Sequence, residues 1–142
     1  KYKVGAYHED FGLTSLIILK AKSFVSTNEY GYYYLQSDNS ITRNQNYDKE
    51  IKKAKDLLGH YDDMIKIIKN YEISNKSKEL IKRYYTNTLI LKTKELKGQE
   101  KKQYINDIYK RKLYKNIKPY NLKQLIKRII LKFNINLYLK LR

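Results

Sequence analysis

A chain of 142 residues with 42% apolar side chains is long enough to form one domain with a hydrophobic core. The absence of cysteine excludes disulfides and thiolate metal sites. The longest apolar runs span four residues, as at 16–19, whereas a membrane-spanning helix requires roughly 20. The sequence therefore contains no candidate for such a helix.

Positive charge is concentrated in the second half of the chain. The formal net charge is +17 at pH 7. Residues 1–71 contain 11 basic and 9 acidic side chains, whereas residues 72–142 contain 20 basic and 5 acidic ones, a net of +15, and no acid follows Asp107. The second half either presents a Lys-rich face to water or binds a polyanion, such as anionic lipid, nucleic acid or a phosphorylated substrate.

Residues 10–46 predict a helix, two short strands and a loop. Asp10 is placed to cap a helix in which apolar residues recur at helical spacing. Residues 24–27 and 32–36 have the composition of strands, with a turn at 28–31 between them. The polar residues that follow, up to position 46, predict a loop.

From Asp48 onward the pattern is helical. An apolar stripe at three-four spacing runs from Ile51 to Ile68. A second helix is predicted from Ser77 to Gly98, and a third from Gln99 to Asn116, before Pro119. We therefore expect a mainly α fold with a small β element.

The last predicted helix, residues 121–133, is the most amphipathic. Two interpretations stay open: its apolar stripe packs on the preceding helices as core, or the helix lies on a membrane surface. In the second case the cations on the opposite face would contact anionic lipid. Those cations are Lys123, Lys127, Arg128 and Lys132.

Two stretches together resemble the closing part of a known catalytic domain. They are Tyr-His-Glu-Asp-Phe at 7–11 and Tyr-Tyr-Tyr-Leu-Gln-Ser-Asp-Asn-Ser-Ile-Thr at 32–42. With the predicted helix and strands between them, they resemble family 2 glycosyltransferases, which are inverting enzymes with a GT-A fold, a Rossmann-like α/β sandwich. The resemblance covers roughly residues 2–45. It implies that 1–46 is the truncated end of a GT-A domain, followed by a helical extension at 47–118 and a basic amphipathic tail at 119–142.

The resemblance further implies what the parent enzyme does. It would be a hexosyltransferase that carries a sugar from a nucleotide-diphosphate sugar to a glycan or lipid-linked acceptor, in bacterial surface polysaccharide synthesis. Its divalent metal, Mg²⁺ or Mn²⁺, would be held by an Asp-x-Asp motif upstream, since none occurs in these 142 residues. The first residue is Lys1, and we expect the chain to be a C-terminal piece that is inactive alone. Its expected location is the cytoplasm, peripheral on the inner face of the membrane.

The acidic pair carries the implied catalytic role. Asp10 matches the carboxylate that takes the acceptor proton as general base, and Glu9 would tune and orient it. The alternative is a helix-capping Asp beside a solvated Glu. His8 either lines the acceptor pocket or only packs.

Two residues further along are implied to bind substrate. Ser40 keeps its place in the family pattern, where it either donates a hydrogen bond or shapes the turn. Leu35 and Ser37 stand where many relatives have arginine, which leaves Arg43 as a substitute basic contact.

A different function class also fits the charge. The basic half with interleaved tyrosines is compatible with a helical nucleic-acid-binding module without enzymatic activity. No RNP aromatic pattern, GXXG loop or zinc-finger spacing accompanies it, so nucleic acid is not the expected partner. A helical scaffolding domain is a third interpretation.

Overall fold

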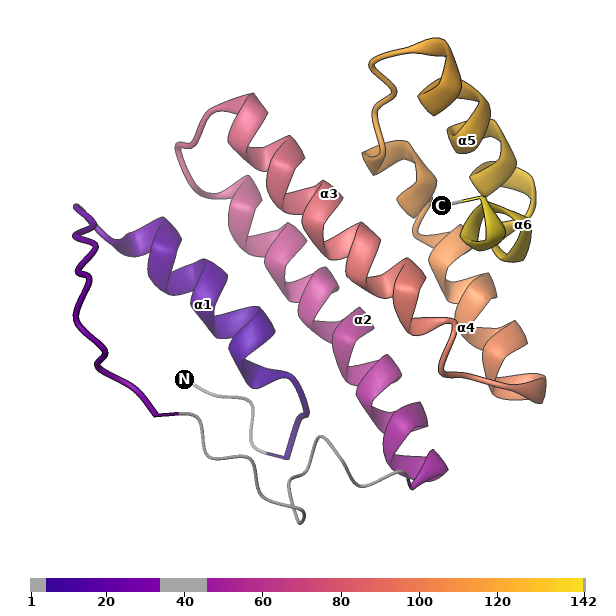
Figure 1. The fold of residues 1–142 in the computed structure, drawn as a ribbon, viewed down its shortest axis with the longest axis horizontal. Coiled ribbons are helices and arrows are strands. Elements are labelled where there is room, and N and C mark those ends of the chain that lie inside the picture. The colour runs from indigo at the N-terminus through magenta and orange to yellow at the C-terminus, as the bar shows by residue number, and fades with distance from the viewer. Residues whose placement is uncertain (1–4, 34–45, 142) are drawn as a thin grey trace.

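The computed structural model describes residues 5–33 and 46–141, which form an all-α assembly (Figure 1). Helices α2 and α3 run antiparallel as a hairpin, α1 lies along them, and α4 leads to the C-terminal pair α5 and α6. The elements are α1 (Glu9–Lys20), α2 (Tyr47–Lys69), α3 (Asn75–Lys92), α4 (Gly98–Lys110), the 3-10 helix η1 (Leu113–Asn116), α5 (Leu122–Phe133) and α6 (Ile135–Lys140).

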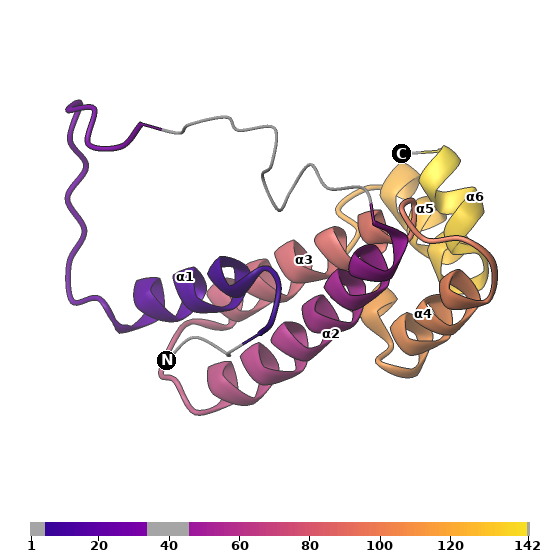
Figure 2. The ribbon, with the colours of Figure 1, turned by 90° about the horizontal axis from the view of Figure 1, so that it is seen from below.

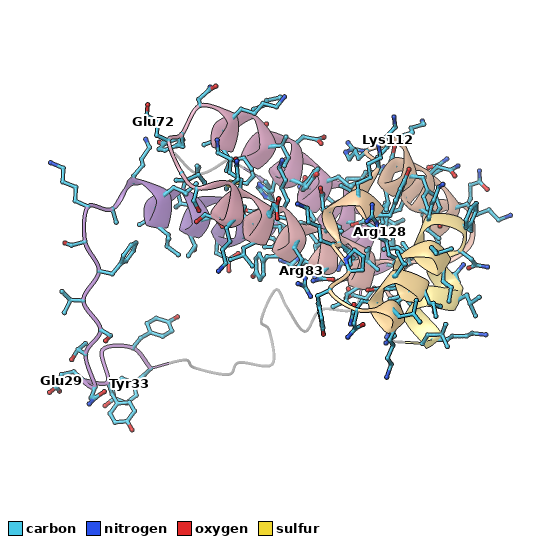
Figure 3. All side chains as sticks on the ribbon, turned by 90° about the horizontal axis from the view of Figure 1, so that it is seen from above. Glu29, Tyr33, Glu72, Arg83, Lys112 and Arg128 are labelled. Atoms are coloured by element: carbon cyan, nitrogen blue, oxygen red, sulfur yellow. The ribbon has the colours of Figure 1, made fainter. Side chains whose placement is uncertain are left out.

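The mainly α expectation is confirmed, but the small β element is not present in the described residues. Residues 21–33 leave the end of α1 and extend away from the helices (Figure 2), and Glu29 and Tyr33 lie at the far end of this segment (Figure 3). Phe24 and Val25, placed in the first predicted strand, are 66% and 94% exposed. A strand is stable only when a neighbour pairs with its backbone, and no described segment does so. Of the second predicted strand, residues 34–36 lie outside the described part.

Capping side chains mark the starts of α2 and α3, whereas Gly98 does not end the helix that it was expected to end. Asn46 and Ser74 accept hydrogen bonds from the first turns of α2 and α3, so α3 begins two residues earlier than predicted. Gly98 was predicted to end α3, which instead ends at Lys92. Gly98 has a φ of +54° and begins α4. A glycine in the left-handed region can mark either end of a helix.

The third predicted helix is interrupted. Lys112 has a φ of 53°, which ends α4 after Lys110 and starts the short 3-10 helix η1. The Asn116 amide then donates hydrogen bonds to the Tyr61 hydroxyl at 3.0 Å and to Thr86 Oγ1 at 2.9 Å. These bonds attach η1 to both α2 and α3.

The hydrophobic core lies between α2, α3, α4 and η1. Tyr85, Leu89, Ile90 and Leu113 are fully buried in it. The C-terminal pair is attached to it through Tyr109 of α4, whose hydroxyl donates to the Leu131 carbonyl oxygen at 3.2 Å and accepts from the Ile135 N–H at 3.0 Å. The core thus holds α1 and α5 on different sides of one helical body.

Replacing Arg111 with Lys should weaken the attachment of α4 to α2. Arg111 Nε and Nη2 donate to the two oxygens of Asp62 at 2.9 Å and 2.7 Å, and this hydrogen bonding raises the pKa of Arg111. Lysine keeps the charge but loses the two-pronged geometry. We expect urea denaturation to show a loss of about 0.5–1 kcal/mol in unfolding free energy, because the pair is partly exposed to water. Lys110→Gln, at an exposed neighbour, is the control, and equal stability of the two variants would contradict this role.

Candidate functional site

The carboxylate of Asp10 lies exposed in the first turn of α1. The Phe11 N–H donates to its Oδ1 at 2.9 Å. The expected capping role is not what the structure shows: the N-cap residue is His8, whose side chain makes no capping hydrogen bond. A carboxylate in the first turn is stabilised by the positive end of the helix dipole. Asp10 is therefore presented to solvent at the helix start.

Contacts of α1 with α3 hold this helix start in place. The Tyr85 hydroxyl donates to the Phe11 carbonyl oxygen at 2.6 Å and lies 3.2 Å from Ser15 Oγ. The Phe11 and Tyr85 rings pack with their centroids 4.2 Å apart. Burial raises the pKa of Tyr85, so its hydroxyl stays protonated and can donate. The residue next to Asp10 is thus fixed by both its backbone and its ring.

Contacts with α2 fix the segment before α1. His60 Nε2 donates to the Tyr7 carbonyl oxygen at 2.9 Å, and the Tyr7 N–H donates to Asp56 Oδ2 at 2.9 Å. Gly12 passes directly over the His60 ring, where a Cβ atom would come within 3.0 Å of Nδ1. Glycine at this position permits the close approach of α1 to α2.

An open cavity of about 980 Å³ lies beside the start of α1, between α2, α3 and the segment before α4. Two of its lining residues are joined by hydrogen bonds: the Tyr47 hydroxyl donates to the Lys97 carbonyl oxygen at 3.0 Å and accepts from the Lys97 N–H at 2.8 Å. The lining residues are His8, Phe11, Tyr47, Glu50, Lys53, Leu57, Thr88, Leu91, Lys92, Glu95 and Lys97.

The wall of the cavity is an ionic cluster centred on Glu50. Its two oxygens lie 2.6 Å from the ammonium groups of Lys53 and Lys92, and both lysine side chains are only 7% exposed. Lys92 also pairs with Glu95. Burial alone would raise the pKa of Glu50, but hydrogen bonds from Lys53 and Lys92 outweigh it and lower that pKa to about 2. The Glu50 carboxylate is therefore charged at neutral pH.

His8 connects this cluster to Asp10. Its Nε2 is buried and makes no hydrogen bond within the described residues. Burial lowers the pKa of His8, and the positive charges of Lys92 and Lys53 lower it further, whereas Asp10 raises it. A neutral imidazole therefore lines the cavity two residues before Asp10 in the chain, with its Nε2 shielded from solvent. Asp10 itself does not line the cavity.

The structure does not describe the side chains of the other residues predicted for the catalytic site. Glu9 begins α1, but its side chain is not among those the structure describes, and Ser40 and Arg43 also lie outside the described residues. Among described residues, no three His, Asp or Glu side chains are close enough to hold a metal ion.

The basic amphipathic helix is oriented with its apolar side outward. On α5 only Leu131 is buried, and the partly buried residues are Gln124, Lys127, Arg128 and Ile130, of which Ile130 packs against the core. We name the outward apolar side the α5–α6 surface; Leu122 and Phe133 at its ends are 73% and 74% exposed. Its residues are Leu122, Ile126, Ile129, Phe133, Leu137 and Leu141.

The predicted membrane-contacting cations divide into two groups. Lys123 and Lys132 are exposed, while Lys127 and Arg128 are partly buried. Lys123 and Lys127 border a shallow recess of about 430 Å³ in the α5–α6 surface. Within the described residues, every helix is too short or too polar to cross a membrane.

Sequence reasoning did not find the Glu50 cluster. Glu50 and Lys53 are three residues apart on one helix, but Lys92 is 42 residues away from Glu50 in the chain. No feature of the sequence distinguishes Lys92 from the many lysines that are exposed to water. Only the pairing of α2 with α3 brings these charges together.

Comparison with known proteins gives no match: no family model, curated protein or solved structure resembles this chain closely enough to be significant.

Proposed function

We propose that this chain is the C-terminal, acceptor-side part of an inverting family 2 glycosyltransferase, with Asp10 as its general base. The resemblance at residues 7–11 and 32–42 is the starting point of this proposal. The observation that carries it is that Asp10 is exposed on a helix start that α2 and α3 hold rigidly. A general base must be accessible to its substrate and fixed in position.

In this proposal Asp10 carries out one step, the removal of a proton from the acceptor hydroxyl. As an acceptor hydroxyl attacks the anomeric carbon of the donor sugar, the carboxylate takes the hydroxyl proton and the nucleoside diphosphate leaves. A base positioned for such a transfer contributes typically 10²–10⁴-fold to the rate.

The cavity beside α1 is the proposed site for part of the acceptor. Its volume of about 980 Å³ lies within the range of small-molecule sites. Sugar hydroxyls both donate and accept hydrogen bonds, which matches a wall of fixed carboxylate and ammonium groups. The imidazole of His8 is part of this wall and lies near enough to Asp10 for the carboxylate to raise its pKa, against the larger lowering by burial.

A donor screen tests the proposal. The full-length protein is incubated with a panel of nucleotide-diphosphate sugars, glycan and lipid-linked acceptors, and Mg²⁺ or Mn²⁺. We expect acceptor-dependent release of a nucleoside diphosphate from one donor, with inversion at the anomeric carbon measured by NMR. Retention of configuration, or no transfer from any donor by a folded full-length protein, would contradict the proposal.

A further inference from the structure

We infer that the α5–α6 surface docks onto an anionic lipid membrane. An apolar stripe on a helix is normally packed against the rest of the protein. Here most of the stripe is not: Leu131 and Ile135 fill the interface with the body and Ile130 contacts the core, but Leu122, Ile126, Ile129 and Phe133 remain outside. Exposed apolar side chains gathered over two adjacent helices mark an interaction site.

The shape of the surface fits a flat, apolar partner. Helix α5 has 12 residues and is about 18 Å long at 1.5 Å per residue. Leu141, directly after α6, lines the recess together with Leu122, and Leu137 of α6 is exposed as well. A helix pair of this kind can lie in the interface plane with its apolar side among the acyl chains.

The charges around the α5–α6 surface are positive, which favours a partner with negative charge. Lys123 and Lys127 border the recess, and the Lys132 ammonium lies 5.1 Å from the centre of the Phe133 ring. No acidic residue follows Asp107. Lysines placed at the edge of an apolar surface extend to lipid phosphates while their methylene stems remain among apolar groups.

These same features argue against other occupants. A second copy of this chain would place like charges opposite each other. Nucleic acid would meet the lysines, but its phosphates would leave the aliphatic side chains of Leu122, Ile126 and Ile129 exposed. An anionic bilayer satisfies both the apolar centre and the basic edge.

Vesicle sedimentation of the full-length protein tests the inference without any need for turnover. We expect binding to phosphatidylcholine vesicles that contain phosphatidylglycerol, and weak binding to phosphatidylcholine alone. Ile126→Gln and Ile129→Gln should each weaken partitioning about tenfold, because each removes an exposed aliphatic side chain that the membrane would bury. Lys123→Gln and Lys132→Gln should each weaken it about fivefold, with a smaller effect at high salt.

Matched controls lie on α3. Leu80 is exposed to a similar degree, at 57%, and Lys76 is exposed near the start of the same helix. Leu80→Gln and Lys76→Gln should leave partitioning unchanged, and circular dichroism should show the same fold in every variant. The inference is overturned if the α5 variants bind vesicles as tightly as these controls. It is also overturned if the α5 variants instead dissociate a dimer or abolish RNA binding while vesicle binding persists.

Discussion

Replacing Asp10 with Asn in the full-length protein should lower kcat for sugar transfer by about 10²–10⁴-fold, the usual contribution of a positioned general base. Asparagine has nearly the same shape, and α1 is held by Phe11 and Tyr7 rather than by the Asp10 side chain. The fold and the affinity for the nucleotide sugar should therefore be preserved. Turnover under saturating donor and acceptor, together with donor binding by calorimetry, measures the two effects separately.

Asp63→Asn is the matched control, because it makes the same chemical change on the exposed side of α2. Asp63 pairs there with Lys66 at 3.6 Å, and both side chains are more than half exposed. We expect its transfer rate to equal that of the unmodified protein. If Asp10→Asn and Asp63→Asn have the same rate, Asp10 is not the base.

Replacing Glu50 with Gln should destabilise the fold by about 3 kcal/mol, the lower end of the cost of breaking a buried ion pair. The substitution leaves Lys53 without its carboxylate, while Lys92 keeps Glu95. Urea denaturation at neutral pH measures the loss. Glu29→Gln, in the exposed segment after α1, should change stability by less than about 0.5 kcal/mol. Equal stability of the two variants would show that the cluster contributes nothing to folding.

The same cluster predicts an acid-dependent loss of stability. The pKa of Glu50 falls from 4.5 to about 2 on folding. A depressed folded-state pKa contributes stability that is complete above the unfolded value and is lost as pH falls toward the folded value. The unmodified chain should therefore lose this contribution as pH falls from 4.5 toward 2, and Glu50→Gln should show a shallower decline over that interval.

The helices could be predicted from the sequence because their signals are local. Apolar spacing placed α2 and α5, and Asn46 and Ser74 occur where caps are needed. The strand at 24–27 was wrong because a strand depends on a partner elsewhere in the chain. Gly98 was assigned to the wrong helix end because its left-handed φ is compatible with both.

The functional surfaces could be predicted only in part. The sequence divided α5 into an apolar and a basic face, but the pattern did not reveal which face turns inward. The long stems of Lys127 and Arg128 can pack against protein while their charged ends reach water, so the basic face is compatible with either orientation. The unpaired nitrogen of His8 depends on burial by α2 and α3, which no local pattern encodes.

The most direct test of the proposed role of Asp10 is an experimental structure of the full-length protein with a nucleoside diphosphate and an acceptor bound. We expect α1 to keep its contacts with α2 and α3, and an Asp10 carboxylate oxygen to lie within about 2.6–3.2 Å of an acceptor hydroxyl. A bound acceptor that is remote from Asp10, with that carboxylate facing only solvent, would contradict the account.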